Sequence, residues 1–129
     1  MSDLDANFSL SQIGQIAVPV ANIDRAVRFY RDTLGMRFLF QVPPGLGFFD
    51  LNGVRLMLDE PAKAQAGNSS VIYYKVENIE AASATLLKRG VDFERAPHLI
   101  ATMPDHDLWM AFLRDPDENL IGLMSEIKR

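Results

Sequence analysis

The stretch QIAVPVANIDRAVRFYRDTLG, residues 15–35, holds the pattern that decides the fold. Apolar and polar side chains alternate over residues 15–20, which is typical of a half-buried β-strand. The apolar spacing then changes to that of a helix. Asn22 is suited to cap this helix, because its side-chain oxygen can accept a backbone N–H of the first turn, and Gly35 is suited to its end. The stretch therefore predicts a strand followed directly by an amphipathic helix.

Three short strand-like runs follow this helix, at residues 37–42, 47–51 and 54–59. The last two are separated by Asn52-Gly53, a pair that favours the tight turn of a β-hairpin because both residues tolerate positive φ. The first half of the chain therefore predicts the element order βαβββ.

The same order of patterns returns in the second half of the chain. An offset of 56 residues aligns Asn22 with Asn78 and Ala26 with Ala82. Three later runs repeat the strands, at residues 92–96, 108–114 and 120–125. We therefore predict an α+β fold of two tandem βαβββ modules, which form a curved mixed sheet around a groove and carry their helices on the convex side.

Polar and turn-rich segments divide the chain. We expect a polar N-terminal extension at residues 1–12, a first βαβββ module at 13–60, a linker at 61–70, a second βαβββ module at 71–126 and a C-terminal tail at 127–129. Because a module of this size buries too little apolar surface to be stable alone, the two modules should share a core.

The charge and the cysteine content narrow the classes of function. The chain has 17 acidic and 13 basic residues, which disfavours nucleic acid and anionic membranes as partners. It has no apolar run of the ~20 residues that a membrane span needs, and its polar start does not resemble a secretory signal. It also has no cysteine, which excludes disulfides and thiolate chemistry. We therefore expect a cytoplasmic protein whose partner is a small molecule.

Three segments resemble sequences of the vicinal oxygen chelate superfamily, which includes glyoxalases, bleomycin-resistance proteins and extradiol dioxygenases. They are QIAVPVANIDRAVRFYRDTLGM at residues 15–36, VIYYKVENIEAA at 71–82 and AFLRDPDENLIGLMSE at 111–126. The resemblance implies the paired βαβββ fold and a homodimer. It does not decide the function, because the family holds both enzymes and proteins that only bind a ligand.

Many members of this family hold one divalent metal ion with side chains from the first and last strand of each module. The resemblance carries these four positions to Gln15, Met57, Val71 and Gly122. Only Gln15 offers an oxygen donor, and a divalent ion needs at least three protein donors of suitable charge. We therefore expect no cofactor, and a divalent metal ion is disfavoured.

Strand alternation predicts which side chains line the groove. If the apolar residues of the first strand face the helices, the alternate residues face the ligand. A shift of one residue in register would bring Asp59 or Glu60 inward instead. The predicted ligand-binding residues are Gln15, Arg55, Met57, Val71, Tyr73, Trp109, Gly122 and Met124. Most of these side chains are equally compatible with a buried core.

Residues 97–109 contain both histidines of the chain, His98 and His106, and its only tryptophan, Trp109. This segment precedes the seventh expected strand, where related proteins place a loop over the groove. We expect a lid in which His106 or His98 acts as a catalytic acid or base, because a neighbouring carboxylate can hold a histidine in one tautomer. A solvated turn is the alternative. A metal site built from these histidines and an aspartate lacks recognisable ligand spacing.

Two functions fit these residues. The first is a glyoxalase- or bleomycin-resistance-like protein that binds a small, partly apolar ligand in the groove without the family metal ion. The alternative is a lyase, isomerase or dioxygenase of the same family that uses His98 and His106, either without metal or with relocated metal ligands. Elemental analysis of the purified protein distinguishes the first from a metalloenzyme.

Overall fold

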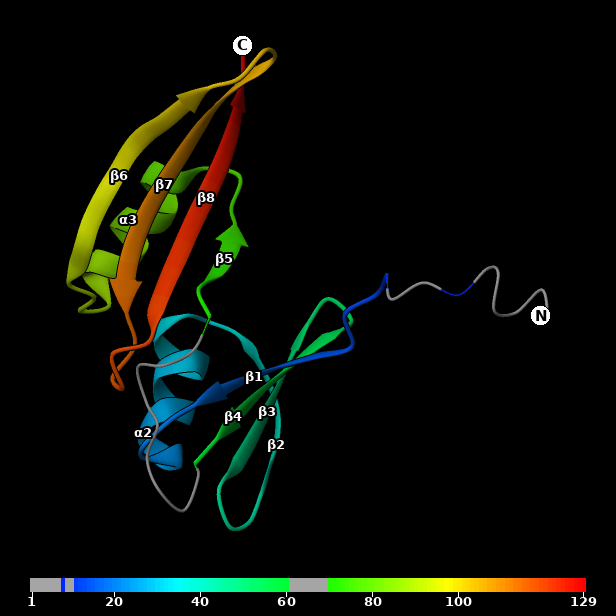
Figure 1. Ribbon diagram of the computed structural model, residues 1–129. Coiled ribbons are helices and arrows are strands. Elements are labelled where there is room, and N and C mark those ends of the chain that lie inside the picture. Colours follow the sequence, from blue (N-terminus) through cyan, green and yellow to red (C-terminus); the bar gives the residue numbers. More distant parts are fainter. Residues whose placement is uncertain (1–7, 9–10, 61–69) are drawn as a thin grey trace.

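A computed structural model of the chain describes residues 8, 11–60 and 70–129 (Figure 1). The expected N-terminal extension and the expected linker lie mostly outside these ranges. In the described part, eight strands form two four-stranded sheets, and each sheet has a helix against one face. No helix in these ranges is long and apolar enough to cross a membrane.

The first sheet has the strand order β1-β4-β3-β2. Its strands are β1 (Gln15–Pro19), β2 (Arg37–Val42), β3 (Leu46–Leu51) and β4 (Val54–Asp59). β1 pairs with β4 in parallel, and the other neighbours are antiparallel. Helix α2 (Ile23–Arg28) follows β1 and continues into the π-helical turn η1 (Phe29–Thr33). This is the βαβββ order that the first half of the sequence predicts.

The second sheet repeats this topology with the order β5-β8-β7-β6. Its strands are β5 (Ile72–Lys75), β6 (Phe93–Thr102), β7 (His106–Arg114) and β8 (Leu120–Lys128), and helix α3 (Ile79–Lys88) follows β5. β5 pairs with β8 in parallel, as β1 does with β4. The duplication predicted from the sequence is therefore confirmed in the strand order and in the strand directions.

The two helices begin in the same way. The Asn22 side-chain oxygen accepts the backbone N–H of Arg25 over 3.0 Å, and Asn78 accepts that of Ala81 over 3.0 Å. Each bond satisfies a backbone donor that a helix N-terminus otherwise leaves unpaired. The predicted Asn22 cap is confirmed, and Asn78, which the 56-residue offset aligns with it, caps α3 in the same way.

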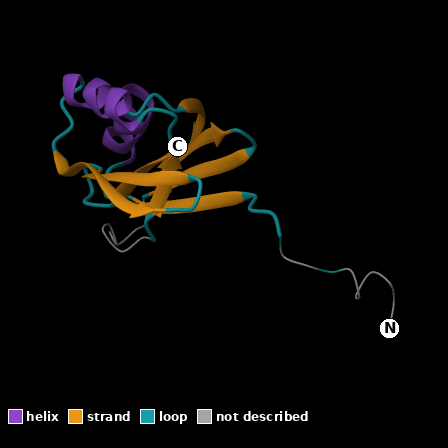
Figure 2. Ribbon diagram, turned by 90° about the horizontal axis from the view of Figure 1, so that it is seen from above, coloured by secondary structure: helices purple, strands orange, loops and turns teal. Residues whose placement is uncertain are grey.

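The core lies between each helix and its sheet. Figure 2 shows the helices on one side of the strands, so the other side is left to strands and loops. Burial alternates along the strands, with the apolar residues that face a helix almost fully buried. The buried core residues are Val18, Val20, Ile23, Ala26, Val27, Tyr30, Phe49, Leu56, Leu58, Ile79, Leu86, Val91, Ala111, Leu113, Ile121 and Leu123.

The modules meet through polar contacts between the first module and the turn that joins β7 to β8. The Tyr30 hydroxyl donates to the Asp115 carboxylate over 2.8 Å, and the Asn119 side-chain amide donates to the Pro19 carbonyl over 2.9 Å. Burial raises the pKa of Tyr30, so its hydroxyl remains a donor. These buried hydrogen bonds hold the two modules together.

The α+β fold of two tandem βαβββ modules is confirmed, but its strands do not form one continuous curved sheet. Among the described strands, none of the first sheet pairs with any of the second. The alternation of side chains predicts strands and their faces, whereas the pairing of one module with the other is set by tertiary contacts. In this chain those contacts join the β7–β8 turn to η1 and to the end of β1, and not two strand edges.

The expected lid at residues 97–109 is instead a β-hairpin. β6 continues to Thr102 and β7 begins at His106, which leaves a short turn between the two strands. The pairing of β6 with β7 is irregular between Arg95 and His98, where Pro97 cannot donate a backbone hydrogen bond. This irregularity allows a proline within the strand. Because a proline usually ends a strand, the sequence pattern predicts a loop there.

Candidate functional site

Each sheet has one face covered by its helix and one face without a helix, which we call its open face. In β1 and β4, Val18 and Leu56 are buried under helix α2, while Gln15 and Arg55 are exposed on the opposite face. In β5, the exposed Tyr73 alternates with residues that are partly buried. The alternation of side chains predicted from the sequence is therefore confirmed, and it assigns the residues of the open faces.

The first open face combines an aromatic pair with polar side chains. Phe48 lies directly opposite Met57 in the β3–β4 ladder, and its ring centroid is 5.0 Å from that of Phe40. The Arg55 guanidinium lies over the Phe48 ring, with its central carbon 5.7 Å from the centroid. The Gln15 amide nitrogen lies 3.7 Å from the Met57 sulfur. This face therefore presents aromatic surface beside one cation and one amide.

The second open face is more apolar. The rings of Tyr73 and Phe112 meet edge to face, with centroids 5.9 Å apart, and His98 lies 6.4 Å from Phe112. Met110 and Met124 lie directly opposite one another in the β7–β8 ladder. Aromatic rings and adaptable thioether side chains together form a surface suited to an apolar or aromatic molecule.

Gly122 lies beneath the ring of Tyr73. A Cβ atom at position 122 would lie 2.6 Å from Cδ2 and 2.8 Å from Cε2 of that ring, closer than carbon atoms can approach. The two residues are register partners in the β5–β8 ladder. The Tyr73 ring can occupy this position because residue 122 has no side chain.

The four positions that the family uses for a metal ion do not form a donor set here. Gln15 and Met57 share the first open face, but Val71 lies beside β5 with an apolar side chain and Gly122 is covered by Tyr73. Within the described ranges, no three His, Asp or Glu side chains gather where they could hold a metal ion. These residues do not fit the family metal ion.

Asp59 and Glu60, the two carboxylates that a shift in register would bring into the groove, lie on different faces at the end of β4. Asp59 lies opposite Leu46 in the β3–β4 ladder, on the same face as Met57. The Glu60 carboxylate accepts the backbone N–H of Ile23 over 2.8 Å and so supports the start of α2. Glu60 is thus engaged on the helix side, and a metal site that needs both carboxylates is not assembled.

The two histidines lie apart on the β6–β7 hairpin. His98 is paired with Met110 on the second open face, while His106 is paired with Lys128 near the hairpin turn. Met110 and His106 are four residues apart on β7, which corresponds to roughly 13 Å along the strand. The structure therefore brings only His98 to the aromatic cluster.

Each histidine has one ring nitrogen close to an acceptor. Nδ1 of His98 lies 2.8 Å from the Ala96 carbonyl oxygen, and Nδ1 of His106 lies 2.7 Å from the Asp105 carboxylate. The hydrogen bond from His106 lowers the pKa of Asp105. When Nδ1 of His98 donates to Ala96, its Nε2 is left as an acceptor, which is the state that a general base needs.

Trp109 lies on the covered face of the second sheet. It pairs with Leu99 and Ser125 in the ladders and packs against the core. Neighbouring residues on β7 point to opposite faces, so Trp109 is separated from Met110 and Phe112. The structure does not bring Trp109 together with the other predicted ligand-binding residues.

Several residues of the open faces are absent from the sequence prediction, namely Phe40, Phe48, Met110 and Phe112. A signal for two of them is present, because Leu108, Met110 and Phe112 alternate along one face of the seventh expected strand. The face itself follows from the ladder partners Gly122 and Met124 on β8.

The chain is similar to proteins of known structure over nearly its whole length. Residues 12–123 match the family described as the Glyoxalase/Bleomycin resistance protein/Dioxygenase superfamily. An antibiotic binding protein from Streptomyces sp. CB03234, TnmS3, is 25% identical with a TM-score of 0.76, over 93% of this chain and 99% of that one. Lactoylglutathione lyase from Agrobacterium tumefaciens is 18% identical with a TM-score of 0.75, over 91% of this chain and 95% of that one. No curated protein sequence matches the chain.

Proposed function

Since this chain belongs to the glyoxalase/bleomycin resistance protein/dioxygenase superfamily, we propose that it binds a small, partly apolar molecule on its open faces without the usual metal ion of the family. The observation that carries the proposal is the ring of Tyr73 lying on Gly122. At this position, where the family usually has a metal-binding side chain, the protein presents an aromatic surface.

The chemistry of both open faces supports a ligand with an apolar or aromatic body. Tyr73, His98 and Phe112 form a continuous ring cluster on the second face, and Phe48 carries a cation above its ring on the first. Ligand sites commonly combine such apolar walls with a few polar groups that fix orientation. The similarity to an antibiotic binding protein agrees with a role in binding.

We further propose that two copies of the chain together complete the binding groove. Within one chain the described strands form two separate sheets, so the two open faces are not parts of one curved sheet. A homodimer in which the first sheet of one copy lies beside the second sheet of the other would join the faces twice, with two-fold symmetry. Sedimentation equilibrium tests this arrangement, and a strict monomer at high protein concentration contradicts it.

The cytoplasm is the location we propose for this protein. The proposal rests on the complete lack of cysteine and on the acidic composition. Cell fractionation with an antibody against the protein checks it, and recovery from a membrane or extracellular fraction contradicts it.

A thermal-shift screen tests the binding function. Probes from four classes, namely thiol conjugates, acyl-CoA esters, catechols and aromatic antibiotics, are added to untagged protein in the presence and absence of a chelator. A ligand that binds only the folded state raises the melting temperature. We expect at least one class to do so equally with and without chelator.

Matched variants locate the binding surface. Tyr73→Ala removes a ring from the second open face, and Leu87→Ala removes an exposed apolar side chain on helix α3, away from that face. We expect Tyr73→Ala to abolish most of the thermal shift and Leu87→Ala to preserve it. Binding that is equal in both variants, or that occurs in neither the variants nor the parent protein, contradicts the proposal.

Acid–base catalysis is a second candidate function, and the position of His98 favours it. This histidine lies beside Phe112 on the second open face with Nδ1 held by Ala96. An incubation with methylglyoxal and glutathione, followed by measurement of the lactoylglutathione formed, tests the reaction of the lactoylglutathione lyase that this chain is similar to. Turnover that disappears in His98→Gln but persists in His106→Gln supports catalysis; the absence of turnover in all three proteins argues against this reaction.

A further inference from the structure

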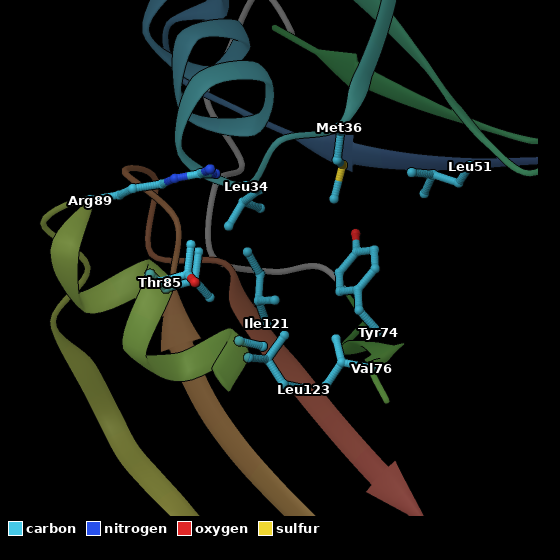
Figure 3. Close-up of a pocket in the computed structure, with 11 residues that line it drawn as sticks. Leu34, Met36, Leu51, Tyr74, Val76, Thr85, Arg89, Ile121 and Leu123 are labelled. Atoms are coloured by element: carbon cyan, nitrogen blue, oxygen red, sulfur yellow. The ribbon is translucent and has the colours of Figure 1, made fainter. Parts of the chain in front are cut away.

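A cavity of about 320 Å³ lies between the two modules, on the helix side of the sheets. It is separate from the open faces, so a ligand bound there would be independent of the proposed function. Figure 3 shows side chains from both modules around it, with Leu34 and Met36 from the first module opposite Ile121 and Leu123 from the second. Most of the lining is aliphatic, which favours an apolar occupant.

One wall of this cavity carries a tyrosine where the first module has a buried aliphatic residue. Tyr74 lies 56 positions after Val18, which is almost fully buried under helix α2. Figure 3 shows the Tyr74 hydroxyl directed into the space below Met36. The second module therefore places a polar group in an otherwise apolar wall.

The Tyr74 hydroxyl is available to a ligand as a donor. It makes no hydrogen bond with any residue in the described ranges. Burial, together with the charge of Asp115, raises the pKa of Tyr74 to about 12, so the hydroxyl is protonated at neutral pH. A donor that no described residue accepts, at the edge of an apolar cavity, matches a ligand with an oxygen acceptor.

A cation lies at the other side of the cavity. Arg89 follows helix α3, and Figure 3 shows its side chain extending from α3 toward Leu34. One guanidinium nitrogen, Nη1, donates to the Thr33 carbonyl over 3.0 Å. Arg89 forms no ion pair with any carboxylate among the described residues. No carboxylate of the described residues thus pairs with this positive charge beside the cavity, and an arginine fork binds carboxylates well.

We propose that this cavity is a second binding site, for a small monocarboxylic acid with an apolar body and an oxygen acceptor at its far end. The carboxylate would lie at Arg89 and the acceptor at the Tyr74 hydroxyl, with the body against Leu34 and Ile121. Because both modules line the cavity, the bound acid would also stabilise the contact between them.

Calorimetric titration of the full chain with 4-hydroxyphenylacetate tests this site. Phenylacetate lacks the far acceptor, and tyramine replaces the carboxylate with an ammonium group on the same type of skeleton. We expect 4-hydroxyphenylacetate to bind more tightly than phenylacetate, and tyramine not to bind. No binding of either acid, or equal binding of tyramine, overturns the proposal.

Variants assign the contacts. Arg89→Gln should weaken binding of 4-hydroxyphenylacetate roughly tenfold or more, because it removes a charge-assisted hydrogen bond, and Tyr74→Phe should weaken it roughly fivefold. Lys88→Gln removes a neighbouring positive charge at the end of α3 and should leave the affinity unchanged. Equal losses in Arg89→Gln and Lys88→Gln would show general charge attraction and overturn the assignment.

Two further variants keep the test decisive. Thr85→Met extends a side chain into the cavity from α3 and should abolish binding while the protein stays folded. Tyr73→Ala lies on the open face and should leave the titration unchanged, so this site and the proposed open-face site can fail independently. Unchanged affinity in folded Thr85→Met places the acid elsewhere and overturns the proposal.

Discussion

The covered faces of the two sheets resemble one another, whereas their open faces do not. Corresponding positions of the parallel strand pairs show this directly. On the covered faces, Ile16 and Leu56 of the first sheet correspond to Ile72 and Ile121 of the second. On the open faces, Ala17 and Met57 correspond to Tyr73 and Gly122.

In the open-face pair, the large and the small residue also lie on opposite strands in the two sheets. In the first sheet a small residue, Ala17, lies opposite a large one, Met57, while in the second sheet the large Tyr73 lies opposite Gly122. Burial under a helix restricts most covered positions to apolar or aromatic side chains that fill the space. The open positions are free of that restriction, so they can change their chemistry without loss of the fold.

The largest expected effect is a difference in stability between substitutions of two adjacent residues that lie on opposite faces. Leu56 is fully buried, so Leu56→Ala should lower the free energy of unfolding by about 2–5 kcal/mol. Met57→Ala, one residue along β4 on the open face, should cost less than about 1 kcal/mol and act mainly on ligand binding. Urea denaturation measures both. Equal losses of stability would break the distinction between the faces.

The next effect concerns the contact between the modules. Asp115 is buried and accepts hydrogen bonds from Tyr30, from Asn119 and from the Asp117 backbone. Asp115→Asn should lower the free energy of unfolding by about 3 kcal/mol, because it leaves buried donors without an acceptor. Glu118→Gln, exposed in the same turn, serves as the control. An unfolding curve identical to that of the control would mean that this contact is not needed.

A smaller effect should follow from overfilling the open face. Gly122→Ala places a methyl group against the Tyr73 ring and should cost about 2 kcal/mol. Tyr73→Ala should remove most of that cost when the two changes are combined. Thermal or urea unfolding of the double-mutant cycle measures the coupling, and additive effects would contradict the close contact.

The smallest expected effect concerns Tyr74, on the covered face of the second sheet, at high pH. The pKa of Tyr74 is raised to about 12 in the folded state, above the ordinary value of 10.0, so the folded protein should lose stability as pH rises from about 10 to 12. The loss near pH 11 should be about 1 kcal/mol for this group. Burial raises the pKa of Tyr30 too, which adds in the same direction.

Urea denaturation at several pH values above 9 measures this alkaline loss. Tyr74→Phe should reduce the slope of stability against pH, while Leu87→Ala, which removes an exposed apolar side chain of α3, should keep it. A slope that is unchanged in Tyr74→Phe would show that this tyrosine is not protected from ionisation in the folded protein.

Much of the fold can be predicted from local sequence patterns. The helix caps at Asn22 and Asn78 and the alternation along β1 each depend on a few neighbouring residues. The 56-residue offset follows from comparing the two halves of the sequence. The separation into two sheets cannot be predicted in this way, because it depends on contacts such as Tyr30 with Asp115, 85 residues apart. The strand at Pro97 is missed because an irregular ladder tolerates a residue that usually ends a strand.

The site is predictable to the extent that strand alternation determines it. Alternation correctly places Gln15, Met57 and Tyr73 on the open faces, because a strand side chain can point only one of two ways. The prediction does not include Phe112, because the face of the strand at residues 108–114 is not assigned from the sequence. The sequence pattern groups Trp109 with a loop, although this residue belongs to the covered face of a strand.

Elemental analysis tests the central claim most directly. Untagged protein is purified without chelators, and its transition-metal content is measured per chain. The aromatic surface over Gly122 predicts a content far below one ion per chain, with ligand binding intact. One transition-metal ion per chain, lost together with ligand binding when a chelator is added, would contradict the account.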